Sequence, residues 1–248
     1  MADQFEKWNK HKSGETPWVN RRMDHAHRSV FIDHVLSDSI ASVIEVGPGE
    51  MVEYSKIREQ KNLSYHIVDV SSSFIDDAQR RFPEIRATKI PMEEMNEVHF
   101  DIDPFDIAYV ASVLEHSYDI KKAIKNILSI SKKFHFVFFR WTFLDDLTPF
   151  FKIKKTKDKK KSKKYYSSYF NIFMILDYIR ELGTIHYADV ISTSGEMRMS
   201  FTEYYEKQKR EDFKYINPKD FLNKGKDNNH LYHRNGNYLM VHGASRIA

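Results

Sequence analysis

The stretch VIEVGPGE, residues 43–50, decides the fold. Four residues with the pattern of a buried strand run directly into two glycines separated by a proline. Because glycine has no Cβ, the backbone at Gly47 and Gly49 can approach a ligand closely. A strand that ends in such a turn predicts a binding site at its carboxyl end.

Strand patterns alternate with helix patterns on both sides of this stretch. We expect strands at residues 42–46, 65–70, 85–90, 105–112, 134–141, 184–192 and 238–242, and helices at residues 51–60, 71–81, 120–131 and 165–182. The alternation predicts an α/β fold: a doubly wound, Rossmann-like, seven-stranded sheet, mostly parallel, with helices on both faces. Ligands of such sheets bind beyond the carboxyl ends of the strands.

The ends of the chain differ from this central pattern. Residues 1–40 are expected to form an N-terminal helical segment, with apolar residues at helical spacing between residues 21 and 36. Residues 41–248 would then form the ligand-binding domain. Within it, residues 152–164 hold nine lysines in thirteen positions and are expected to form a basic loop. The insertion at residues 196–235 is expected to cap the site.

Composition excludes several classes of chemistry. The chain has no cysteine, which excludes disulfides, thiolate metal sites and a cysteine nucleophile. His25 and His27 lie two positions apart on an expected helix and face different directions, so no metal site is predicted. The first residues are polar and the apolar runs are of strand length, which predicts a cytoplasmic location and no membrane span.

The acidic residues around the glycines indicate the kind of ligand. Asp69 lies 20 residues beyond Gly49 at the end of the second expected strand, where a carboxylate can accept both hydroxyls of a ribose. Glu45 and Glu50 flank the glycines and would repel the pyrophosphate of a dinucleotide. The same negative charge suits S-adenosylmethionine (SAM), which carries a sulfonium and an ammonium group. The pattern therefore favours SAM over a nicotinamide dinucleotide.

These residues also carry a family resemblance, which spans residues 41–143. Residues 45–49, EVGPG, resemble the first motif of class I SAM-dependent methyltransferases, and residues 111–116, ASVLEH, resemble the Leu-Glu-His signature of their small-molecule branch. The resemblance implies that Gly47 and Gly49 flank the methionine part of SAM, with Glu45 beside them. It implies that Asp69 holds the ribose with Val70 next to it. Ala111 and Ser112 would border the cofactor through their backbone.

Two positions depart from the family pattern. Met51 stands where a third glycine is usual, so a stiffer or differently shaped turn is expected. The acid that often contacts adenine after the third strand is missing, and the backbone around Met92 is expected to take its place.

Further candidate residues for binding the methyl acceptor and the cofactor lie at strand ends and in the N-terminal segment. His116 follows the fourth strand and is the candidate general base, with a structural histidine as the alternative. Arg22 is a candidate for the cofactor carboxylate and Arg21 for an anionic acceptor, against the alternative of a solvated helix face. Arg140 and Trp141 end the fifth strand and are candidates for acceptor contacts.

Together these features predict a SAM-dependent methyltransferase with a small or glycan-linked acceptor, methylated at oxygen. The arginines and the lysine-rich segment fit an anionic acceptor, such as a phosphorylated metabolite or a surface sugar. Two alternatives remain open: an RNA methyltransferase that uses the lysine-rich loop, and a non-catalytic, methyltransferase-like partner protein. The sequence does not indicate an oligomeric state.

Overall fold

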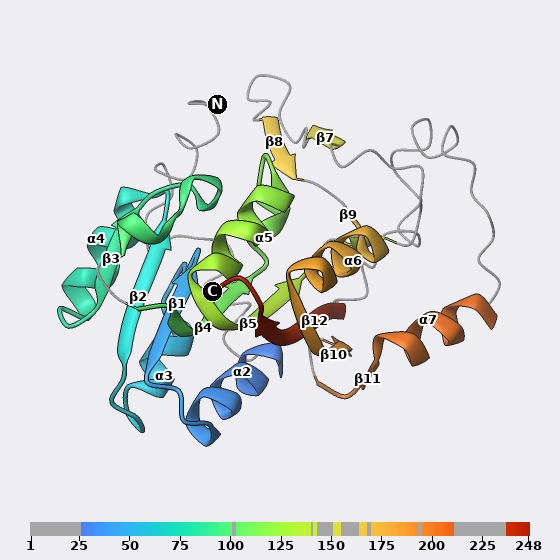
Figure 1. Cartoon of the computed structure of the whole chain (residues 1–248), viewed down its shortest axis with the longest axis horizontal. Helices are drawn as coiled ribbons and strands as arrows, with labels where there is room; N and C mark the ends of the chain where they lie inside the picture. The colour runs from blue at the N-terminus through green and yellow to red at the C-terminus, as the bar shows by residue number, and fades with distance from the viewer. Residues whose placement is uncertain are drawn as a thin grey trace.

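The computed structural model describes residues 26–100, 103–139, 141–142, 151–154, 164–167, 170–192, 195–210 and 237–248. Its centre is an eight-stranded sheet with the strand order β11-β10-β12-β5-β4-β1-β2-β3 (Figure 1). The neighbouring pairs from β3 to β5 are parallel, whereas β12 runs antiparallel to both β5 and β10. The predicted α/β class is confirmed, with the short edge strand β11 as an eighth member.

The bounds of the elements follow the alternating pattern of the sequence. The sheet comprises β1 (Ser42–Val46), β2 (Ser64–Asp69), β3 (Arg86–Lys89), β4 (Phe105–Ala111), β5 (Ser131–Phe138), β10 (Gly183–Ser192), β11 (Arg198–Ser200) and β12 (Asn237–Ser245). The α-helices are α2 (Ala26–Ser37), α3 (Val52–Ile57), α4 (Ser72–Arg81), α5 (Ile120–Ser129), α6 (Ile172–Leu182) and α7 (Phe201–Arg210). Short 3₁₀ turns are η2 (Met92–Glu94), η3 (Glu97–His99) and η4 (Leu114–His116).

The order of the strands fixes where a ligand can bind. From β1 the chain moves outward in one direction to β2 and β3, and it then returns to place β4 on the other side of β1. The strand order therefore reverses between β1 and β4. In open α/β sheets the binding site lies at this reversal, outside the carboxyl ends of the strands.

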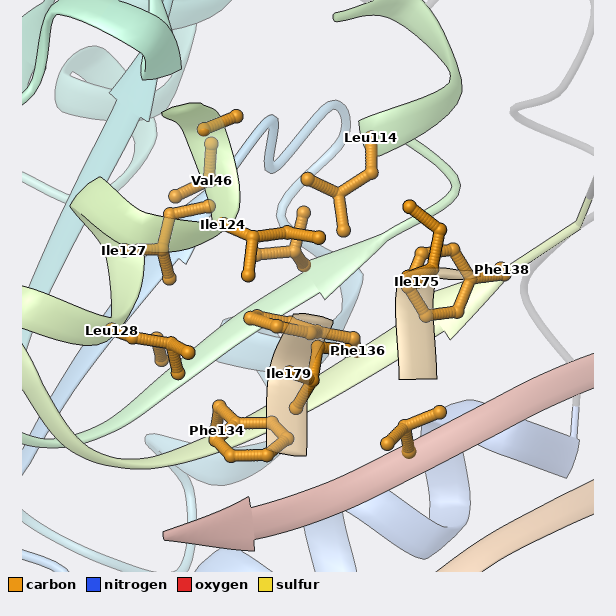
Figure 2. Packing of buried hydrophobic residues seen from close by; sticks show 14 of the residues in the cluster. Val46, Leu114, Ile124, Ile127, Leu128, Phe134, Phe136, Phe138, Ile175 and Ile179 are labelled. Carbon is orange, nitrogen blue, oxygen red and sulfur yellow. The ribbon is translucent and has the colours of Figure 1, made fainter. Parts of the chain in front are cut away.

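Alternating side chains of the central strands fill two apolar layers. Val43 and Tyr109 point to the face covered by α2 and α3, whereas Ile44 and Val110 point to the face covered by α5 and α6. Figure 2 shows the second layer, in which β-strand phenylalanines meet aliphatic residues of the helices. Its labelled members are Val46, Leu114, Ile124, Ile127, Leu128, Phe134, Phe136, Phe138, Ile175 and Ile179.

Helix α2 attaches the N-terminal segment to the sheet. Phe31 and Val35 are fully buried, and the Phe31 ring stacks on Tyr109 of β4 with 3.9 Å between ring centroids. The helix predicted between residues 21 and 36 is thus present from Ala26 onward, and residues 1–25 lie outside the described part of the chain.

The expectation of one helix over residues 165–182 is wrong at its start. Residues Lys164–Ser167 form strand β8, which pairs antiparallel with β7 (Phe151–Lys154). Phe170–Asn171 forms the short strand β9 beside β6 (Trp141–Thr142). Helix α6 begins only after Asn171, whose side chain accepts hydrogen bonds from the amides of Phe173 and Met174 at 2.9 and 3.2 Å.

Both ends of the lysine-rich segment, expected to form a loop, lie in strands. Lys152 and Lys154 lie in β7, and Lys164 pairs with Lys154 across the β7–β8 ladder. Residues 155–163 lie outside the described part of the chain, as do residues 211–235 of the expected cap. Within the described ranges, no helix has both the length and the apolar character needed to span a membrane.

Candidate functional site

The turn after β1 has a backbone conformation that favours glycine. Gly47 and Gly49 have φ angles of 69° and 55°, in the left-handed region. The Gly47 amide donates to the Val68 carbonyl of β2 at 2.8 Å, which ties the turn to the neighbouring strand. A Cβ built on Gly49 would meet no atom of the described residues within 4 Å, so these residues leave the backbone of the turn uncovered.

Met51 keeps the glycine-like backbone of this turn. Its φ and ψ angles are 59° and 35°, and its side chain is fully buried. The left-handed conformation costs a non-glycine residue about 1–2 kcal/mol. Burial of the methionine side chain offsets that cost, so the turn holds Met51 in a left-handed conformation.

Asp69 ends β2 beside the glycine turn. Its Oδ1 accepts a hydrogen bond from the Ser71 amide at 2.8 Å, which fixes the orientation of the carboxyl group. Burial raises the pKa of the Asp69 carboxyl to about 6, although hydrogen bonds from the Ser71 and Val70 amides oppose this shift. A carboxylate retains further acceptor sites after one hydrogen bond. Asp69 can therefore accept from the paired hydroxyls of a ribose.

The turn after β4 lies against the glycine turn. Ser112 follows Ala111 with a φ of 57°, and its amide donates to the Val137 carbonyl of β5 at 2.8 Å. A Cβ at Gly47 would lie 2.5 Å from Cγ2 of Val113. The turns after β1 and β4 thus touch at the point where the strand order reverses.

The segment after β3 is anchored to the same region. Met92 begins η2, and its carbonyl accepts from Nδ2 of Asn126 in α5 at 3.2 Å. The next residue, Glu93, is buried, and its Oε1 accepts from the Ser117 hydroxyl at 2.5 Å and from the Tyr118 amide at 2.8 Å. Glu93 thereby links the segment after β3, expected to contact the adenine, to the segment after β4, expected to contact the acceptor.

His116 lies in a 3₁₀ turn that is held on both sides. The preceding Glu115 is buried and accepts from the Phe139 amide at the end of β5 at 2.7 Å. The following Ser117 is held by Glu93. The His116 side chain is half-buried. Its position just beyond β4 agrees with the place expected for a base, and its role as a base stays a prediction.

Glu45 belongs to a buried network rather than to an open rim. Its Oε2 accepts from the Tyr65 hydroxyl at 2.8 Å, and the residue is 3% exposed. In α3, Glu53 is bound by Nη1 of Arg28 at 2.6 Å and by the Tyr109 hydroxyl at 3.0 Å. Burial raises the pKa of Glu45 well above its ordinary value, and the nearby Glu53 raises it further.

Of the four remaining residues predicted to contact a ligand, the structure describes only Trp141. Arg21, Arg22 and Arg140 lie outside the described residues, so their roles stay predictions. Trp141 is 1% exposed and packs near Phe201 and Tyr204 of α7, with 6.1 and 5.9 Å between ring centroids. The structure therefore places Trp141 in the apolar layer.

Three residues of the site were missed from the sequence: Arg28, Glu53 and Glu93. Each meets a partner that lies 24 or more positions away along the chain. The available signal was weak: Arg28 lies one turn before Phe31 on the buried face of α2, where an arginine requires a buried partner.

The residues that the structure brings together fit the predicted cofactor. The bare backbone at Gly49 leaves room for close approach, Asp69 offers acceptor oxygens, and the acidic pair Glu45 and Glu53 lies next to the turn. Such a set suits a nucleoside that carries positive charge. No group of three or more His, Asp or Glu in the described ranges could hold a metal ion.

Comparison with protein families identifies a methyltransferase domain in this chain. Residues 44–133 match a family model described as a methyltransferase domain. This range includes the glycine turn, Asp69, Met92 and His116. A comparison with curated proteins gives no match.

Solved structures share the fold over nearly the whole chain at low identity. The N-methyltransferase NodS of Bradyrhizobium japonicum, in complex with S-adenosylhomocysteine (SAH), is 12% identical with a TM-score of 0.57, covering 98% of this chain and 99% of that one. The 1,6-didemethyltoxoflavin N1-methyltransferase of Burkholderia thailandensis, with its substrate and SAH, is 14% identical with a TM-score of 0.54, covering 94% and 82%. The N-terminal domain of EvdMO1, in the presence of SAH and D-fucose, is 9% identical with a TM-score of 0.56, covering 99% and 96%.

Proposed function

We propose that the chain is a class I SAM-dependent methyltransferase that methylates a small or glycan-linked acceptor at an oxygen atom. The match of residues 44–133 to a methyltransferase domain and the order of the strands support the proposal. The observation that carries the proposal is the position of His116. It lies five residues beyond the end of β4, in η4, and Val113 at the start of this turn touches the glycine turn. Bound SAM supplies a methyl group that its sulfonium has already activated.

The residues of this chain would then position the two reactants. The glycine turn and Asp69 hold the cofactor, with Val70, Met92, Ala111 and Ser112 around it. Positioning supplies most of the catalysis in such a transfer. An acceptor hydroxyl must also lose its proton, and His116 accepts it at a ring nitrogen. A general base contributes about 10²–10⁴-fold.

The acceptor chemistry rests on charge and on one structural neighbour. EvdMO1 was solved in the presence of a sugar, D-fucose, whereas NodS and the toxoflavin enzyme are named as N-methyltransferases. A histidine base is needed more by a hydroxyl than by an amine, which supports oxygen here. The nine lysines of residues 152–164, with Arg21 and Arg140, would attract an anionic acceptor.

A comparison of methyl transfer to different classes of acceptor tests this proposal. Purified protein is incubated with SAM and with phosphorylated sugars, oligosaccharides, small amines or RNA, and the formation of SAH is measured. We expect turnover with a hydroxyl-bearing sugar or sugar phosphate and none with amines. Turnover confined to amines would contradict the oxygen acceptor. Turnover confined to RNA, lost at high salt, would favour the lysine-rich segment as an RNA-binding element.

A further inference from the structure

Two buried carboxyl groups face a single cation beneath the glycine turn. Glu45 and Glu53 are 3% and 1% exposed, and the Arg28 side chain is 13% exposed. Arg28 binds Glu53 directly at 2.6 Å, whereas Glu45 receives only the neutral hydroxyl of Tyr65. An isolated buried carboxylate is costly, and such groups take up a proton instead.

Within the described part of the chain, the elements around this pair supply no second cation. The groups that act on Glu45 are Glu53 of α3, Tyr65 and Asp69 of β2, and Arg28 of α2. Tyr109 of β4 adds a hydroxyl that donates to Glu53, and Tyr238 of β12 acts on Arg28. Of these described residues, Arg28 is the one cation. One negative charge of the pair is therefore uncompensated unless a proton or a positive ligand is present.

The pair lies close along the chain to the glycine turn, which is the proposed cofactor site. Glu45 precedes Gly47 by two residues in β1, and Glu53 lies in the first turn of α3 directly after Met51 and Val52. The two residues thus lie on either side of the glycine turn along the chain. SAM adds positive charge at this turn, which favours the ionised form of a nearby carboxyl group.

We propose that Glu45 of the Glu45–Glu53 pair holds a proton in the cofactor-free protein and releases it to solvent when the positively charged cofactor binds. The carboxyl O–H bond breaks, the proton passes to a buffer base, and no electrons are transferred. The carboxylate that remains is compensated by the cofactor. SAM affinity then rises with pH by about tenfold per pH unit in the range where the free pair still holds its proton.

Calorimetric titration counts this proton directly. SAM is titrated into the protein at pH 7.5 in buffers of different ionisation enthalpy, and the dependence of the heat on the buffer gives the number of protons released. At this pH Asp69, with its pKa of about 6, is already ionised and cannot supply the proton. We expect on the order of one proton released for SAM. Methylthioadenosine, a neutral nucleoside without either cationic group, is expected to release none.

Matched variants assign the proton to the pair. The Glu45→Gln side chain keeps an oxygen that accepts from Tyr65 but cannot release a proton. This variant should therefore bind SAM more weakly, and its heat of binding should not depend on the ionisation enthalpy of the buffer. Its binding of methylthioadenosine should be unchanged, which also reports that the variant is folded. Glu84→Gln is the control, since Glu84 is half exposed and paired with Tyr54 and Arg58, and it should behave as the parent protein.

The outcomes separate this inference from the assignment of the cofactor. SAM binding without proton release, or equal release by methylthioadenosine, would overturn the proposed exchange and leave the cofactor site intact. Release that persists in Glu45→Gln would overturn the assignment to this pair. Absence of SAM binding in the parent protein would contradict the cofactor site itself.

Discussion

Gly47 and Val113 are packed so closely that a Cβ on the glycine would lie 2.5 Å from Cγ2 of the valine. The contact joins the turn after β1 to the turn after β4, one on each side of the reversal in strand order. The turn after β1, which we propose holds the cofactor, and the turn after β4, which we propose faces the acceptor, are thus parts of one packed unit. This relationship makes the geometry of one turn depend on the other.

Alanine substitutions at the two glycines should have different effects. Gly47→Ala combines a left-handed φ with a clash and should lower the free energy of unfolding by about 2–4 kcal/mol. In Gly49→Ala the added methyl group meets no described atom, so the free energy of unfolding should fall by only about 1–2 kcal/mol because of the backbone conformation. The same methyl group should obstruct the proposed cofactor and weaken SAM binding. Chemical denaturation and SAM titration of both variants check this. Equal stability of the two variants would contradict the packing described at Gly47.

The Met51→Gly variant tests how backbone strain and side-chain burial each contribute to the free energy of unfolding. Glycine relieves about 1–2 kcal/mol of left-handed strain but removes a fully buried side chain, which costs about 2–5 kcal/mol. We expect net destabilisation of about 1–3 kcal/mol, measured by urea denaturation. A variant more stable than the parent protein would show that Met51 lowers the free energy of unfolding, because its backbone strain outweighs its burial.

The strands that position the site were predictable because their patterns are local. Strand β1 has the bounds expected from the sequence, Ser42–Val46, since a β-branched run meets glycine at its end. Strand β5 begins three residues earlier than expected, at Ser131. Lys132 and Lys133 could enter the strand because Asp106 and Asp38 pair with them at 3.0 and 2.9 Å. Those partners are distant in sequence and carry no local signal.

The parts that could not be predicted depend on tertiary contacts. Residues 164–167 have the aromatic character of a packed helix, but they form a strand because β7 is available to pair with them. The same limit applies to the site. Its glycines and Asp69 are visible as a motif, whereas the link from Arg28 to Glu53 spans 25 residues and exists only once α2 packs on the sheet.

His116→Asn tests the proposed base. The variant should lose about 10²–10⁴-fold in kcat while its affinity for SAM stays unchanged, because the side chain is assigned to the acceptor. The rise of kcat with pH that an imidazole base produces should also disappear. Kinetics across pH, with the exposed His99→Asn as control, check both effects. A kcat within about twofold of the parent protein would leave His116 with a structural role.

The histidines packed beneath α2 should make the fold sensitive to acid. Burial lowers the pKa of His135 well below its ordinary value and lowers that of His242 to about 3. The unfolded chain therefore binds more protons than the folded one as pH falls below about 6.5, and stability declines by up to about 1.4 kcal/mol per pH unit for each group. The raised pKa of Asp69 acts in the opposite direction between pH 3.8 and about 6.

Denaturation of the parent protein and of His135→Leu between pH 7 and pH 5 checks this effect. Both ring nitrogens of His135 have no hydrogen-bond partner within the described residues, so leucine removes a proton-binding group without breaking a bond. The variant should lose less stability on acidification. An identical pH dependence in both proteins would exclude His135 as a source of acid sensitivity.

The central claim is that a cationic nucleoside cofactor binds at the joined ends of β1, β2 and β4 with its ribose on Asp69. The most direct measurement is the dissociation constant of SAM for the parent protein, for Asp69→Ala and for Asp76→Ala, which alters an exposed aspartate on the adjacent helix. Loss of hydrogen bonds to a charged group should weaken binding by about 10- to 100-fold in Asp69→Ala and leave Asp76→Ala unchanged. A parent protein without affinity for SAM, or equal affinity in all three proteins, would contradict the account.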